Sequence, residues 1–167
     1  WMNSSHNSNL NSKENTMSTK TFQLGSISTG TLLLKDLIPV FIDTIHQLTL
    51  PGVPNASVDW TGADARLFDD DFFTSDDADQ TMVEFVEILN ELCPPFIYFG
   101  TLEGDGADFG FWVDVEAIGE SIRHETESDE SVSGDHVLPS ENVIIQINDH
   151  GNATCYDMER NVIWSAV

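Results

Sequence analysis

The chain has 167 residues, 40% of them hydrophobic, and a formal net charge of −23 from 29 acidic and six basic side chains. This length suits one domain with a modest core, and ten Phe and four Trp are too many for a wholly disordered acidic chain. Because a charge of this sign repels phosphate, the composition argues against direct binding of nucleic acid.

The negative charge is concentrated in the middle of the chain. Between Asp59 and Asp135 there are 22 acidic residues and only two basic ones, Arg66 and Arg123. Such a density costs stability through self-repulsion, and it attracts positively charged surfaces. We therefore expect the partner to be a protein with a basic surface.

We expect neither a membrane span nor a secretion signal in this sequence. No run of about 18 apolar residues occurs, and the N-terminal residues are rich in Asn and Ser without a hydrophobic stretch. Cys93 and Cys155 have no metal-ligand spacing and form no disulfide framework, so we expect two buried thiols. We expect a cytoplasmic protein with no cofactor and no membrane partner.

The N-terminal quarter combines a tail with a helix. Residues 1–20 are polar and aperiodic, which predicts a disordered tail before a single domain at 21–167. A first helix is predicted from Asp36 to Leu48, with Asp36 as its cap and Pro39 in its first turn. Its apolar stripe consists of Leu37, Phe41, Ile45 and Leu48.

A second helix is predicted after a long connection at residues 51–75. It begins at Ser75 or Asp76 and ends at Leu92, before two prolines. Aspartates in its first turn complement the positive end of the helix dipole. The expected buried stripe consists of Met82, Phe85, Leu89 and Leu92.

Strands dominate the rest of the chain. Alternating residues at 96–102 and 109–115 predict a hairpin around Gly104-Asp105-Gly106, followed by a short helix at 117–123. The acidic, Ser-rich segment at about 125–140 is predicted to be a mobile loop, and strands follow at 143–147, 153–157 and 162–167. The expected fold is α+β, with two main helices on one face of an antiparallel, hairpin-rich sheet of about five strands.

The acidic runs do not match a calcium-binding loop. An EF-hand loop starting at Asp76 would place Ala78 at its third position, and one starting at Asp105 would place Ala107 there. The five histidines are scattered without the spacing of a zinc site. We assign no metal-binding residue.

The carboxylates Glu103, Asp105 and Asp108 flank the predicted hairpin turn. A carboxylate pair can perform acid–base chemistry, but no nucleophile–base pairing accompanies these residues in the sequence. We therefore assign no catalytic residue, and an enzyme with a carboxylate or metal site remains an alternative.

The predicted partner-binding residues lie where side chains can project without disturbing the core. On an alternating strand, Trp112 faces away from Phe111, and an exposed Trp rimmed by acids would be a binding anchor. The predicted surface consists of Asp69, Asp70, Asp71, Asp76, Asp77, Asp79, Glu103, Asp105, Asp108 and Trp112.

Two stretches resemble small uncharacterised proteins of tailed bacteriophages. One is Tyr98-Phe99-Gly100-Thr101-Leu102-Glu103-Gly104-Asp105-Gly106-Ala107-Asp108-Phe109-Gly110-Phe111-Trp112. The other is the ending with Ile147-Asn148-Asp149-His150-Gly151-Asn152, Tyr156-Asp157 and Ile163-Trp164-Ser165. The resemblance spans about residues 20–167. It implies an accessory gene product of the host cytoplasm, of the kind that inhibits host defence, and it supplies no functional residues.

The leading hypothesis is a non-enzymatic interaction protein of phage type. Its acidic surface would occupy a basic, nucleic-acid-binding surface of a host protein, as DNA mimics do, because spaced carboxylates can replace phosphates and long-range attraction speeds association. One alternative is a salt-adapted or cation-binding structural protein, since the chain has only three lysines. The other is the enzyme with a carboxylate or metal site.

Overall fold

The computed structural model describes residues 21–49, 70–126 and 133–166. The predicted tail at 1–20, Asp69 and the middle of the acidic segment lie outside them. Within the described residues the chain forms three α-helices, a short 3-10 helix and seven strands. In chain order these are β1 (Gly25–Thr29), α1 (Leu34–Thr49), η1 (Phe72–Thr74), α3 (Asp76–Glu91), β2 (Ile97–Leu102), β3 (Asp105–Val113), α4 (Val115–Thr126), β4 (Gly134–Leu138), β5 (Val143–Ile147), β6 (Ala153–Asp157) and β7 (Val162–Ala166).

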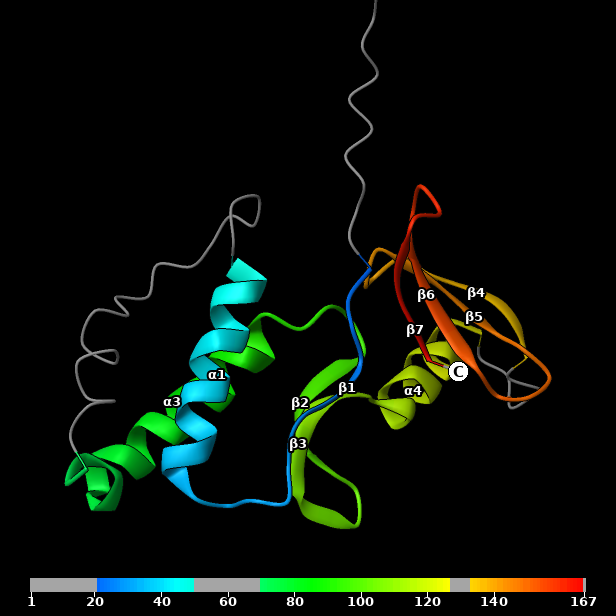
Figure 1. Cartoon of the computed structure of the whole chain (residues 1–167). Helices are drawn as coiled ribbons and strands as arrows, with labels where there is room; N and C mark the ends of the chain where they lie inside the picture. The colour runs from blue at the N-terminus through cyan, green and yellow to red at the C-terminus, as the bar shows by residue number, and fades with distance from the viewer. Residues whose placement is uncertain (1–20, 50–69, 127–132, 167) are drawn as a thin grey trace, which may run out of the picture.

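The predicted α+β class is confirmed, but the strands form two sheets rather than one. The first sheet has the order β1-β3-β2, and the second is the meander β4-β5-β6-β7. All strand pairs in both sheets are antiparallel. Figure 1 shows the first sheet beside α1 and α3, and the second sheet beside α4. The structure has seven strands where about five were predicted, because β1 and β4 lie in segments without an obvious strand pattern.

Aromatic packing joins the first sheet to α1. Phe99 and Phe111 lie opposite each other on β2 and β3, and both are buried. The Phe41 ring of α1 contacts the Phe99 ring edge-on, with 5.0 Å between centroids. This face of the sheet is therefore the covered one, and the face that carries Trp112 points the other way.

The start of α1 differs from the prediction. The helix begins at Leu34, so Asp36 is not its cap and Pro39 lies inside the helix rather than in its first turn. Thr31 makes the side-chain hydrogen bonds at this end of the helix. Its hydroxyl accepts a hydrogen bond from the Leu33 amide at 3.1 Å and donates one to the Asp36 carboxylate at 2.9 Å. Pro39 therefore removes one internal backbone hydrogen bond, a cost that the buried stripe of the helix offsets.

The prediction of a mobile loop at about 125–140 is wrong for residues 134–138. These residues form β4, which pairs with β5, and Leu138 is fully buried. The Asp135 carboxylate accepts hydrogen bonds from Gln146 at 2.8 Å and from Arg160 at 3.2 Å, and these lower the pKa of Asp135. Leu138 is the one large apolar side chain of β4 that faces inward. With a single such residue among many acidic ones, the segment shows no strand pattern in the sequence.

Both sheets share one cluster of buried side chains. Trp164 on β7 has 0% of its surface exposed, and its indole N–H donates a 2.9 Å hydrogen bond to the carbonyl of Pro95, just before β2. The amide of Phe22 donates to the carbonyl of Ile163 at 2.7 Å. Trp164 and Phe22 thus couple the second sheet to the first.

The two cysteines are free thiols; Cys155 is buried as expected, whereas Cys93 is half-buried. Burial raises the pKa of both Cys93 and Cys155 to about 12, with a further contribution from the Asp157 charge at Cys155. Because the thiolate is the reactive form, we expect an aromatic disulfide reagent at pH 8 to modify the native protein far more slowly than the urea-unfolded protein. Equal rates in the two states would contradict the burial of these thiols.

Candidate functional site

The helix α3 presents two faces of opposite character. Ser75 occupies its N-cap position, and the three acids of its first turn lie at the positive end of the helix dipole. Its buried residues are Ala78, Thr81, Phe85 and Leu89, with spacings of three and four residues. That spacing defines one side of a helix. Of the predicted stripe, Phe85 and Leu89 are buried, whereas Met82 and Leu92 are half-buried at the edge of the core.

The opposite side of α3 carries charge of a single sign. The helix has six acidic residues and no Lys or Arg, and all six acidic residues are exposed. We call this surface the acidic face of α3; it consists of Asp76, Asp77, Asp79, Glu84, Glu87 and Glu91.

The charge density of this face is close to that of a nucleic-acid strand. Sixteen residues at a rise of about 1.5 Å make a helix of about 24 Å, or one carboxylate per about 4 Å. One strand of B-DNA carries a phosphate per about 3.4 Å of axis. The mean charge density therefore resembles that of a nucleic-acid strand, with three of the acids in the first turn and three at Glu84, Glu87 and Glu91.

The helix is joined by hydrogen bonds to the first sheet near its C-terminal end. The side-chain amide of Asn90 in α3 donates to the carbonyl of Phe99 and accepts from its amide, both at 2.9 Å. Asn90 therefore pairs with β2 as a neighbouring strand would, which also blocks part of that sheet edge. A partner would meet acids whose backbone positions are already set, and this lowers the entropy cost of binding.

The acidic face destabilises the helix that carries it. Glu87 lies three residues after Glu84 and four before Glu91, so like charges are neighbours on the helix surface. Each such pair destabilises a helix by about 0.2–0.5 kcal/mol. No basic residue within α3 offsets this repulsion.

The predicted aspartates near α3 lie together at its beginning. Asp70 and Asp71 are exposed directly before η1, and Asp76, Asp77 and Asp79 are exposed in the first turn of α3. The glutamates of the acidic face were missed by the sequence reasoning. Glu84, Glu87 and Glu91 are spaced three and four residues apart, on the side of the helix opposite the apolar stripe. This spacing could have identified them, but the runs of adjacent aspartates drew attention away from it.

The acids of the β2–β3 turn form a separate group. Glu103 and Asp105 are exposed, and Figure 1 shows this turn and the start of α3 on opposite sides of α1. The Asp105 carboxylate accepts a hydrogen bond from the Ala107 amide at 3.0 Å. Asp108 is half-buried, and one of its carboxylate oxygens is buried without a hydrogen-bond partner among the described residues. The structure therefore does not bring all the predicted acids onto one surface.

Trp112 lies on the outer face of the first sheet, as the strand alternation predicted. Its side chain is half-buried, and its indole N–H donates to the carbonyl of Gly100 at 3.0 Å. The ring therefore lies across the sheet beside β2 rather than projecting into solvent.

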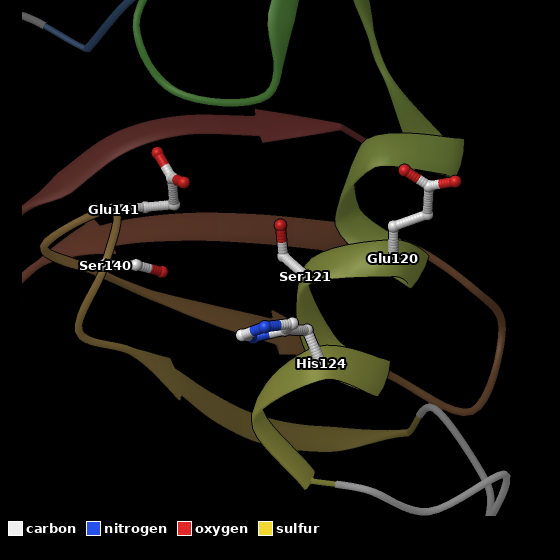
Figure 2. A pocket seen from close by; sticks show the side chains of 5 residues that line it. All are labelled: Glu120, Ser121, His124, Ser140 and Glu141. Atoms are coloured by element: carbon white, nitrogen blue, oxygen red, sulfur yellow. The ribbon is translucent and has the colours of Figure 1, made fainter.

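A hollow between α4 and the β4–β5 turn gathers serine, histidine and carboxylate side chains, the residue types of nucleophilic catalysis. Its lining consists of Glu120, Ser121, His124, Ser140 and Glu141 (Figure 2). The Ser140 hydroxyl donates to Glu125 at 3.4 Å, and in Figure 2 the Ser121 hydroxyl points away from the His124 ring. Among the described residues, no hydrogen bond joins His124 to either serine.

The part of the chain that the structure describes contains neither a cluster of metal ligands nor a membrane-crossing helix. There, no group of three or more His, Cys, Asp or Glu side chains is placed to hold a metal ion. In the same residues, no helix has the length and apolar character needed to cross a bilayer.

The chain was also compared with known proteins. No protein-family model, no curated protein and no solved structure matches it.

Proposed function

We propose that the protein acts without catalysis, by binding a basic, nucleic-acid-binding surface of another protein through the acidic face of α3. The observation that carries this proposal is the row of six exposed carboxylates, unbroken by any base, on one helix. Asp70 and Asp71 extend the row beyond the helix start. A basic groove that normally binds phosphates would accept this row as a substitute.

The energetics favour function over solvation as the reason for the charge. Solubility needs only a net charge of a few units, whereas this chain carries −23 and places like charges side by side on α3. Like charges that repel one another on a single surface lower the stability of the fold. Proteins typically retain such a cost at a binding site. We propose a host protein as this partner, which follows from the phage origin expected from residues 98–112 of the sequence.

The test is affinity capture from a bacterial lysate with three forms of the protein. The first is unchanged, and the second carries Glu84→Gln, Glu87→Gln and Glu91→Gln. The third carries Glu141→Gln, Asp149→Asn and Glu159→Gln, which remove the same charge from exposed turns of the second sheet. We expect the first and third forms to retain a basic nucleic-acid-binding protein and the second to lose most of it.

Glutamine is the replacement on α3 because its helix propensity is close to that of glutamate. The variant should therefore fold, which circular dichroism checks. Equal retention by all three forms would contradict the proposal, as would retention of proteins without a basic surface.

A further inference from the structure

The outer face of the first sheet carries two aromatic side chains over a glycine. Tyr98 and Trp112 are cross-strand partners on β2 and β3. The Trp112 indole donates to the Gly100 carbonyl, and two Tyr98 ring carbons lie 3.5 Å from where a Cβ at Gly100 would stand. A Cβ at this position would make an ordinary van der Waals contact with the Tyr98 ring, so the ring lies over Gly100.

A hollow opens beside Tyr98, between the β2–β3 turn and the start of α4. It is lined by Tyr98, Glu103, Val113, Asp114, Val115 and Glu116, and its volume is about 680 Å³. Val115 projects at its rim with 73% of its surface exposed. The hollow therefore combines an aromatic ring, an aliphatic side chain and carboxylates, with no basic residue among those that line it.

The carboxylates of the hollow differ in how they are engaged. The Asp114 carboxylate accepts a 2.8 Å hydrogen bond from the Ala117 amide and so caps α4. Glu103 and Glu116 are exposed, and neither has a hydrogen-bond or ion-pair partner in the described ranges. Two carboxylates thus remain available to an incoming cation.

We infer that this hollow receives an arginine side chain of the basic partner, an inference that rests on the proposed function. A guanidinium group is planar and weakly hydrated, so it can stack on the Tyr98 ring while its N–H groups reach Glu103 or Glu116. A lysine ammonium is a compact, strongly hydrated charge and gains less from the ring. The hollow supplies selectivity for arginine, which the row of acids on α3 does not.

The experiment is an NMR titration of the full chain with a short capped peptide of alternating Gly and Arg, at about 0.15 M salt. A peptide with Lys in place of Arg serves as the comparison. We expect the Arg peptide to shift the amide resonances of Tyr98, Val115 and Glu116, and the Lys peptide to shift them at several-fold higher concentration. Equal shifts by the two peptides would overturn the selectivity for arginine.

Two variants separate stacking from charge. Tyr98→Leu keeps an apolar side chain without the ring, and we expect it to weaken Arg-peptide binding about two- to fivefold while leaving the affinity for the Lys peptide nearly unchanged. The pair Glu103→Gln and Glu116→Gln should weaken both peptides. The pair Glu141→Gln and Glu159→Gln, with the same change in charge, should weaken neither by a comparable factor.

The outcomes distinguish this inference from the proposed function. Shifts confined to α3 amides would overturn the inference and leave the acidic face of α3 as the basic-partner surface. Shifts confined to the hollow would support the inference and count against α3. Absence of shifts in both places would overturn both.

Discussion

Replacing Trp164 with alanine is expected to lower the free energy of unfolding by about 3–5 kcal/mol. Trp164 is the largest of the fully buried side chains, and its indole N–H bonds the carbonyl of Pro95 across 69 residues of sequence. The substitution leaves a cavity and an unpaired carbonyl at the junction of the two sheets. Domains of this kind have about 5–15 kcal/mol of stability in total, so the loss would be a large share of it.

Urea unfolding followed by far-ultraviolet circular dichroism measures this effect without depending on tryptophan fluorescence. Trp112→Ala is the matched control, because Trp112 is half-buried on the other sheet and the same substitution should cost much less there. Trp164→Phe should fall between the two, since it keeps the ring but not the hydrogen bond. A transition of Trp164→Ala that coincides with the unchanged protein would contradict the coupling of the sheets through this residue.

Neutralising the acidic face of α3 is expected to slow association with the partner about tenfold at low salt. Long-range attraction between opposite charges raises association rates by 10- to about 1,000-fold, and Glu84→Gln, Glu87→Gln and Glu91→Gln remove half of the acids of this face. The dependence of the rate on salt should weaken in parallel, because fewer charges remain to be screened. Stopped-flow mixing over a range of salt concentrations measures both quantities.

The turn variant with Glu141→Gln, Asp149→Asn and Glu159→Gln provides the control for net charge. It loses the same number of charges, so any effect of total charge alone appears in both variants. The helix variant should also melt at the same temperature as the unchanged protein or higher, because it relieves repulsion. Identical association rates for the two variants would mean that the position of the acids on α3 is irrelevant.

The helices and hairpins were predictable because local patterns set them. The apolar spacing of Phe85 and Leu89, and the aspartates ahead of them, are local signals that predict α3. The β2–β3 hairpin follows in the same way from alternation around Gly104, which adopts the positive φ of 87° that glycine tolerates. The beginning of α1 was misjudged because Thr31, outside the apolar pattern, supplies the hydrogen bonds at that end.

The division into two sheets could not be predicted, because it depends on contacts between distant residues. Leu138 is a short apolar signal in an acidic segment, and β4 depends on its pairing with β5 and its contact with α4, which no local pattern predicts. The bond from Trp164 to Pro95 likewise joins segments that no local pattern connects.

The candidate site was only partly predictable, for a related reason. Asp76, Asp77 and Asp79 stand out as adjacent acids, whereas the glutamates of the acidic face become a row only when the helix is formed. The separation of Glu103 and Asp105 from that row depends on where α1 lies between them. Charge is visible in a sequence, but its distribution over surfaces is set by packing.

We propose above all that the acidic face of α3 occupies the phosphate-binding surface of the partner protein. The most direct measurement is competition, in which the captured partner is bound to labelled duplex DNA and this protein is titrated in while fluorescence anisotropy is followed. The account predicts that the DNA is fully displaced, and that the variant with Glu84→Gln, Glu87→Gln and Glu91→Gln displaces it only at much higher concentration. A stable ternary complex, with DNA still bound at saturating protein, would contradict it.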